Sequence, residues 1–155
     1  NMVHMTNWVV NGLPERFPKL KTLWIESGLT WAYSLMQRLD HSYKMRVSDC
    51  PSLKRKPSEY MREMFFSSQP MEMPEDPSIL EATFKMINAE TQLCWSSDYP
   101  HWDFDLPSTV WDLPFVSEKG RHNILGGTAH KLFKLPPRNE AQKQNLIKYG
   151  NYVGG

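Results

Sequence analysis

"CWSSDYPHWDFD", residues 94–105, is the stretch that decides how this sequence is interpreted. It overlaps a predicted strand at residues 91–100, which Pro100 ends. Five of its side chains can ionise or bind a metal: Cys94, Asp98, His101, Asp103 and Asp105. An ordinary surface turn is built from residues such as Gly, Asn or Pro and does not need an aspartate at the end of a buried strand. The stretch therefore indicates a functional site.

Two further strands are predicted upstream, and each ends in a polar side chain. Residues 17–27 contain the β-rich core TLWIE, with Glu26 at its end. Residues 64–70, MFFSSQP, are short and aromatic, and Gln69 precedes the proline that ends them. The three predicted strands thus share the same design, an apolar run followed by a polar group.

Amphipathic helices lie between these strands. Apolar side chains recur at helical spacing over residues 29–43, and Asp76 followed by Pro77 is typical of a helix start. Helical patterns also occur at residues 2–9 and 128–133. Strands that alternate with helices predict a parallel sheet with right-handed crossovers, and its functional groups gather at the carboxyl ends of the strands.

The composition is that of one globular domain without a strong net charge. The chain has 155 residues, and its 18 Lys and Arg against 17 Asp and Glu leave a net charge of +1. This balance favours neither nucleic acid nor an anionic membrane as a partner, and no apolar run approaches the ~18 residues of a membrane-spanning helix. Cys50 and Cys94 lie in unlike surroundings, so we expect no disulfide framework and a reducing, cytoplasmic location.

Several blocks of the sequence resemble one enzyme family. The blocks are GLPERFPKLKTLWIESGLTW, RLDHSY, KRKPSEYMREMFFSSQP, INAETQLCWSSDYPHWDFD and NILGGTAHKLFKL. Together they resemble the C-terminal half of amidohydrolase-2 proteins, a family of metal-dependent (β/α)8 barrels that includes aminocarboxymuconate semialdehyde decarboxylase and resorcylate-type decarboxylases. The block around Asp98 is the most specific part of the resemblance.

The resemblance implies an α/β fold that is only part of a TIM barrel. Residues 1–135 would supply about strands 6–8 with their helices, and residues 136–155 would form a polar C-terminal tail. A complete barrel has eight strands and about 250 residues, and three strands alone would leave an exposed edge and an open core. We therefore expect a longer chain, or a complementary chain, to complete the barrel and to supply histidine ligands.

The resemblance also implies a metal site at Asp98. In the family, a His-x-His pair on the first strand, a His on the fifth and an Asp at the tip of the eighth hold the metal, and Asp98 matches the last of these. A short carboxylate on a rigid strand end can both bind a divalent cation and accept a proton from bound water. Zn is the expected metal, and Mn or Fe also suits such a site.

Glu26 and His101 are the other expected catalytic residues and metal ligands. Glu26 lies where decarboxylases of the family have a His in an HGG-like motif, whereas this sequence has ESG. A glutamate there could bind a metal or orient a water, or could simply pair with Arg38. His101 lies three residues past Asp98 and could bind a metal, transfer a proton or fix the loop by a hydrogen bond.

Other side chains near these positions are expected to have mainly structural roles. Asp103 and Asp105, with Trp102 and Phe104, would line the loop above the barrel. Gln69 could contact substrate or make a structural hydrogen bond. Cys94 is expected to be a small buried side chain of the core. Three histidines are expected on helix surfaces: His41, His122 and His130. His4 is expected near the active-site face of the barrel.

Two classes of function follow from these observations. The leading hypothesis is a metal-dependent hydrolase that acts on a small carboxylate-bearing or aromatic molecule, and a non-oxidative decarboxylase or hydratase is the alternative on the same site. The second class is a non-catalytic barrel subunit that binds a catalytic homologue. Either would form a homo- or hetero-oligomer, and no separate organic cofactor is expected.

Overall fold

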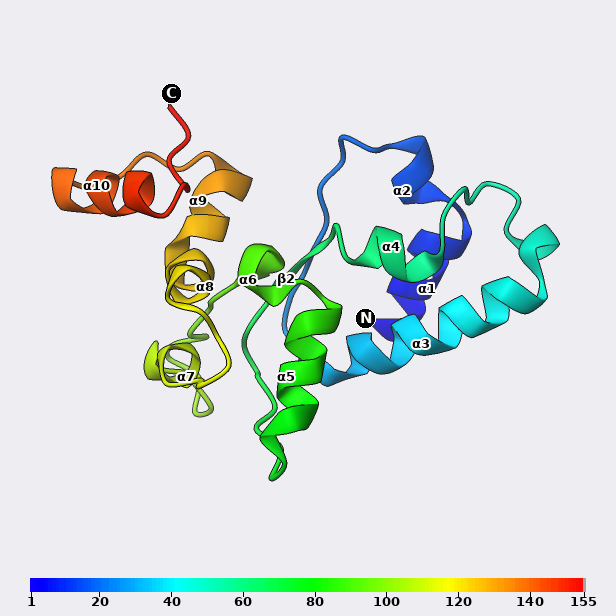
Figure 1. Ribbon diagram of the computed structural model, residues 1–155, viewed down its shortest axis with the longest axis horizontal. Coiled ribbons are helices and arrows are strands. Elements are labelled where there is room, and N and C mark those ends of the chain that lie inside the picture. The colour runs from blue at the N-terminus through cyan, green and yellow to red at the C-terminus, as the bar shows by residue number, and fades with distance from the viewer. Residues whose placement is uncertain (155) are drawn as a thin grey trace.

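The computed structural model describes residues 1–154 and confirms the predicted alternation of helices and strands (Figure 1). The strands are β1 (Leu23–Trp24), β2 (Phe65–Ser67) and β3 (Leu93–Cys94). The helices are α1 (Met2–Val10), α2 (Leu13–Arg16), α3 (Thr30–Met45), the 3-10 turn η1 (Val47–Asp49), α4 (Pro57–Met61), α5 (Pro77–Met86), α6 (Ala89–Gln92), α7 (Ser108–Trp111), α8 (Glu118–His122), the π-helical turn η2 (Asn123–Gly127), α9 (Thr128–Phe133) and α10 (Glu140–Lys148).

The three strands form one parallel sheet in the order β1-β2-β3. Leu23 lies opposite Phe65, and Phe66 lies opposite Leu93. Each strand is therefore the spatial neighbour of the next strand in the chain, which is the order that a (β/α)8 barrel requires. The carboxyl ends of the three strands lie at one edge of the sheet, as predicted.

The strands are shorter than predicted, and two of the three expected strand tips have a left-handed backbone. Glu26 has φ 52° and Asp98 has φ 56°, and a left-handed residue cannot continue a pleated strand. The beginning of the predicted third strand is also different, because Thr91 and Gln92 belong to α6. The polar side chains that we expected at strand tips therefore lie on tight turns just beyond them.

The helices cover the sheet with the apolar faces that the sequence predicts. Helix α3 packs against α4 and α5, and it buries Ala32, Leu35 and Met36. Asp76 accepts a hydrogen bond from the Ser78 N–H at 2.9 Å, which confirms it as the cap of α5. Between α3 and the sheet, Trp31 makes an edge-to-face contact with Phe66 of β2, with ring centroids 6.5 Å apart.

The segment after residue 135 contains a helix and folds back onto the rest of the chain (Figure 1). Asn151 is 3% exposed and donates a 2.6 Å hydrogen bond from Nδ2 to Asn123 Oδ1 in η2. Gly127 makes room for this contact, because a Cβ at that position would overlap the Asn151 amide. His130, expected on a helix surface, is instead buried and stacked on Tyr152.

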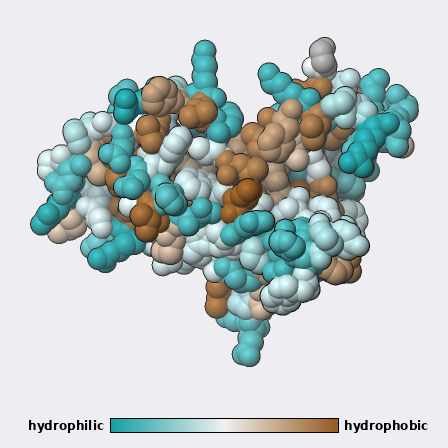
Figure 2. All heavy atoms as spheres, turned by 180° about the vertical axis from the view of Figure 1, so that it is seen from behind, coloured by the Kyte–Doolittle hydropathy of each residue, from teal (hydrophilic) through white to brown (hydrophobic). Residues whose placement is uncertain are grey.

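Apolar side chains also remain on the surface. Figure 2 shows them gathered near the middle of one face, beside a hollow between the two ends of the molecule. Ile25, directly after β1, is 55% exposed, and Phe133, at the end of α9, is also 55% exposed. A complete barrel would add further elements beside β1 and β3, the two edges of the sheet. Among residues 1–154, no helix is both long enough and apolar enough to cross a bilayer.

Candidate functional site

Asp98 lies on a tight turn beyond the carboxyl end of β3. Its side chain is 22% exposed, and its Oδ2 lies 2.8 Å from His101 Nδ1. The backbone supports this contact, because the His101 N–H donates to the Asp98 carbonyl at 2.9 Å. The loop-fixing hydrogen bond that we considered for His101 is therefore present. His101 itself is 68% exposed, so most of its ring is open to solvent.

Asp103 completes a group of three potential ligands with Asp98 and His101. One ligand atom from each side chain lies within 4.8 Å of the others. Among residues 1–154, no other cluster of three or more His, Cys, Asp or Glu side chains has its ligand atoms this close together. Two carboxylate oxygens and one imidazole nitrogen are ligands that suit Zn, Mn or Fe. Asp103 was expected only in the wall of the loop, although its position two residues after His101 in the sequence also suits a metal ligand.

Gln69 ties the loop of this group to the neighbouring strand. Its side chain is 2% exposed, and Nε2 donates to the Asp103 carbonyl at 3.3 Å. The Gln69 N–H also donates to Ser96 Oγ, and the Ser96 N–H donates to Ser68 Oγ. These bonds cross from β2 to β3, so Gln69 holds the loop in place.

Glu26 lies at the end of β1, on the far side of β2 from Asp98. Its side chain is exposed, and its backbone N–H donates to Ser67 Oγ at 3.3 Å. Glu26 is not a member of the three-residue group. The alternative pairing with Arg38 is not among the ion pairs formed by residues 1–154. Its expected role in catalysis or metal binding stays a prediction.

The turn that carries Glu26 is held by a residue that the sequence analysis did not single out. Glu72, in the loop after β2, accepts hydrogen bonds from the Leu29 N–H at 2.7 Å and the Thr30 hydroxyl at 2.7 Å. These donors lie at the start of α3, where N–H groups lack helical partners. Gly28 has φ 69°, and a Cβ there would overlap Glu72 Oε1. The turn therefore requires both residues.

Asp105 lies further along the same loop in a less polar setting. Burial raises the pKa of its carboxyl group, while hydrogen bonds from the Met71 backbone and the Thr109 side chain act in the opposite direction. Its Oδ2 is buried and has no hydrogen-bond partner within residues 1–154. Asp105 thus has one buried carboxylate oxygen without a partner, two residues after Asp103.

The aromatic side chains of this loop project outward. Trp102 is 93% exposed and Tyr99 is 74% exposed. Tyr99 packs edge-to-face on Phe104 with ring centroids 5.6 Å apart. They form an apolar rim next to the three-residue group. His4 is exposed on α1, and the sequence gives no further support for a role there.

Comparison with known proteins places the chain in a family. Residues 1–135 match the family described as amidohydrolase, whereas comparison with curated proteins gives no match. Among solved structures, an amidohydrolase from Mycobacterium avium subsp. paratuberculosis K-10 is 25% identical with a TM-score of 0.67, and the alignment covers 83% of this chain and 32% of that one.

Two decarboxylases are similar as well. The 5-carboxyvanillate decarboxylase from Sphingomonas paucimobilis is 25% identical with a TM-score of 0.64, over 83% of this chain and 38% of that one. A dihydroxybenzoic acid decarboxylase from Polaromonas sp. JS666, solved with manganese and the inhibitor 2-nitroresorcinol, is 24% identical with a TM-score of 0.64, over 91% and 41% of the two chains.

These matches agree with the sheet order and with the predicted partial barrel. The chain spans 32 to 41% of the length of the three solved structures, and its three parallel strands are consecutive neighbours. The fold is therefore the C-terminal portion of a (β/α)8 barrel, completed by residues or a chain outside this sequence. From the match over residues 1–135, we conclude that the chain belongs to the amidohydrolase family.

Proposed function

We propose that this chain carries part of the active site of a metal-dependent carboxy-lyase that removes CO2 from a small aromatic carboxylate. The observation that carries the proposal is the group formed by Asp98, His101 and Asp103 beyond the end of β3, with ligand atoms within 4.8 Å of one another. Active sites of (β/α)8 barrels lie at the carboxyl ends of the strands. The similarity to a 5-carboxyvanillate decarboxylase supports decarboxylation over hydrolysis.

The donor set fits a divalent cation. Asp98 and Asp103 offer carboxylate oxygens and His101 offers an imidazole nitrogen, a mixture that suits Zn, Mn and Fe. The similar Polaromonas decarboxylase contains manganese, which supports Mn as one candidate metal. A cation bound here would act as a Lewis acid that polarises substrate oxygens. Histidines from the rest of the barrel would complete its coordination.

The proposed reaction needs a proton that these side chains can hold. When the bond between the ring carbon and the carboxylate breaks, CO2 leaves and the electron pair stays on the ring carbon, which must then form a bond to a proton. Asp98 and His101 share a 2.8 Å contact through Oδ2 and Nδ1, and such carboxylate–imidazole pairs carry protons in many enzymes. We assign delivery of this proton to Asp98, with His101 held beside it by that contact.

Glu26 is the reason to consider hydrolysis as a second candidate reaction. Decarboxylases of the resembled family have a histidine at this strand tip, and here an exposed glutamate follows β1. Its carboxylate is proposed to orient a substrate or a water molecule at the mouth of the barrel. Attack by such a water on an ester or amide would be the hydrolytic reaction. The same substitution also suits a non-catalytic barrel subunit.

The test is metal analysis combined with two activity assays on the protein assembled as a complete barrel. We expect about one bound divalent metal per barrel, and release of CO2 from at least one member of a panel of hydroxylated and methoxylated benzoates. Asp98→Asn should lose the metal and the activity, whereas Asp49→Asn, which alters an exposed aspartate paired with Arg46, should keep both.

The alternative functions predict different outcomes in the same experiment. Metal together with cleavage of ester or amide substrates, and no CO2 release, would support the hydrolase. A folded complete barrel without metal would support the non-catalytic subunit. Full metal content in Asp98→Asn would contradict the assignment of Asp98 as a ligand.

A further inference from the structure

Gln69 places a buried amide directly beyond the end of β2, the central strand of the sheet. Its side chain is 2% exposed. Burial of a side-chain amide is unfavourable unless its polar atoms find hydrogen-bond partners. The Nε2 atom has such a partner in the Asp103 carbonyl oxygen, at 3.3 Å. The amide is therefore directed at the loop that carries the three-residue group.

The loop needs such a contact because its own hydrogen bonds do not connect its middle to the sheet. The Asp105 N–H donates to the Ser97 carbonyl at 2.9 Å, and this bond closes the loop at its base. The middle of the loop, at Asp103, contacts the end of β2 through the Gln69 amide. A shift of Asp103 would change its distance from the other two members of the three-residue group.

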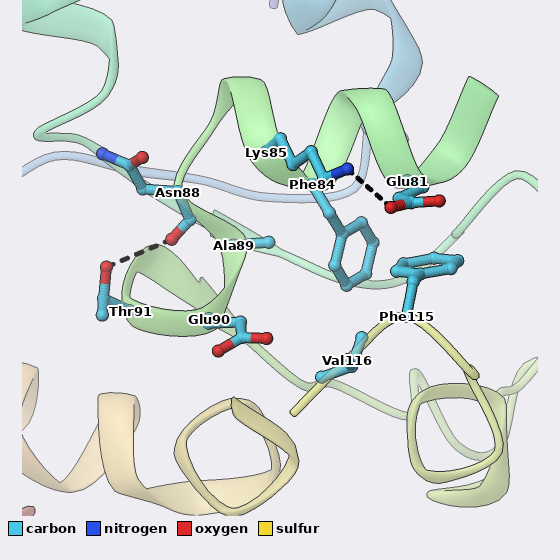
Figure 3. A pocket seen from close by; sticks show the side chains of 9 residues that line it. All are labelled: Glu81, Phe84, Lys85, Asn88, Ala89, Glu90, Thr91, Phe115 and Val116. Carbon is cyan, nitrogen blue, oxygen red and sulfur yellow. Dashed lines mark hydrogen bonds and ion pairs between the residues drawn. The ribbon is translucent and has the colours of Figure 1, made fainter. Parts of the chain in front are cut away.

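A second loop of the molecule is held in a different way, by a carboxylate. Glu90 lines the hollow of about 300 Å³ in Figure 3, beside Val116. Its carboxylate accepts hydrogen bonds from the Ser117 N–H at 2.8 Å and the Ser117 hydroxyl at 2.7 Å, so its oxygens are already occupied. Gln69 instead binds a main-chain carbonyl. The Asp103 carboxylate stays available to a cation, since it forms no ion pair within residues 1–154.

The main chain of Gln69 also connects the loop to the turn that carries Glu26. The Gln69 N–H donates to Ser96 Oγ at 3.3 Å, and its carbonyl accepts from the Ser67 hydroxyl at 3.5 Å. The same Ser67 oxygen accepts from the Glu26 N–H at 3.3 Å. Hydrogen bonds therefore run from Gln69 to both sides of the candidate site.

We propose that Gln69 is a positioning residue, which holds Asp103 beside the other two members of the three-residue group in an arrangement that binds a divalent cation. This inference rests on the metal site of the proposed function. Gln69 acts through the Asp103 carbonyl and is not itself a ligand. Residues that orient metal ligands typically contribute about 10- to 100-fold to metal affinity. Because this bond joins two neutral groups, we expect the lower end of that range, about tenfold.

The test is Gln69→Met, which removes the donor and keeps an unbranched side chain in the buried position. Mn²⁺ is titrated into the protein assembled as a complete barrel, and the free ion is measured by electron paramagnetic resonance. The Kd should rise about tenfold. Gln92→Met is the matched control, since Gln92 Nε2 donates to the Met64 carbonyl at 3.2 Å at the opposite, amino end of the strands. It should leave the Kd unchanged. Unchanged affinity in Gln69→Met, or an equal loss in the control, would overturn the proposal.

Hydrogen exchange of the metal-free protein separates this proposal from the metal site itself. The Phe104 and Asp105 amides donate within the loop, and their exchange should become about five- to tenfold faster in Gln69→Met but not in Gln92→Met. Equal exchange in Gln69→Met and the unsubstituted protein would contradict the role of Gln69, whether or not metal binds. Faster exchange without any Mn²⁺ binding by the unsubstituted protein would refute the metal site and leave Gln69 as the residue that holds the loop.

Discussion

Removal of the Glu72 carboxylate should destabilise the turn that carries Glu26. In Glu72→Ala the Leu29 N–H and the Thr30 hydroxyl each lose a 2.7 Å hydrogen bond. Leu29 is fully buried, so water replaces its lost partner poorly. A hydrogen bond to a charged group contributes about 1.5–3 kcal/mol, and loss of a helix cap costs about 0.5–2 kcal/mol. Since water still reaches the half-buried carboxylate, we expect a loss of about 2–3 kcal/mol.

Gly28 gives an independent way to remove the same contact. An alanine there must adopt φ near 69°, at a cost of about 1 kcal/mol, and its Cβ would displace Glu72 Oε1. Gly28→Ala should therefore cost about 3–4 kcal/mol, which is the backbone strain plus the loss of the cap. In the Glu72→Ala background, the same change should cost only about 1 kcal/mol.

Urea denaturation of the two single variants and the double variant measures this coupling. The double variant should be more stable than the sum of the single effects predicts, by about 2–3 kcal/mol. Glu75→Ala is the matched control, since Glu75 is an exposed glutamate of the same loop. Additive effects of Gly28→Ala and Glu72→Ala would refute the reasoning, because they would mean that the two residues act separately.

Three further predictions concern the C-terminal segment, pH and thiol reactivity. Asn151→Ala removes the buried bond to Asn123 and should cost about 1–3 kcal/mol in urea denaturation, whereas the exposed Asn145→Ala should cost little. Burial lowers the pKa of His122 below its usual 6.5, so as the pH falls the unfolded chain binds a proton before the folded chain does. The free energy of unfolding should therefore decrease as the pH drops through 6.5. His122→Asn should reduce this pH dependence of the urea denaturation midpoint. Burial raises the pKa of Cys94 to about 11, so iodoacetamide at pH 8 should label Cys50 first and Cys94 only on unfolding, as mass spectrometry would detect.

The sequence was sufficient to predict the order of elements because each signal was local. Helical spacing predicted α3, and the Asp76–Pro77 pair predicted the start of α5. The parallel sheet followed from the alternation of strands and helices, and the strand order β1-β2-β3 agrees with it. These features depend on neighbours within a few positions, which a single sequence contains.

The candidate site was less predictable because its contacts are long-range. Glu72 and Leu29 are 43 positions apart in the sequence. Hydrophobic periodicity along the sequence does not predict such a contact. Gln69 was open between substrate and structural roles until its bond to the Asp103 carbonyl, 34 positions away, favoured the structural one. His130 looked like a surface residue because the segment that covers it, around Tyr152, lies beyond the predicted helix.

Three acidic residues of this chain have fixed structural roles, whereas Asp98 keeps its capacity to bind a ligand. Asp40, Glu72 and Glu90 each accept hydrogen bonds from the first residues of a helix or its cap, those of α4, α3 and α8 respectively. Such carboxylates satisfy orphan N–H groups and the helix dipole, so they are not available to a cation. Asp98 differs, because its partner His101 is 68% exposed and is itself a metal ligand by type. A cation that enters this turn therefore meets two ligands without breaking a helix cap, and this difference is the physical reason to expect the chemistry at Asp98.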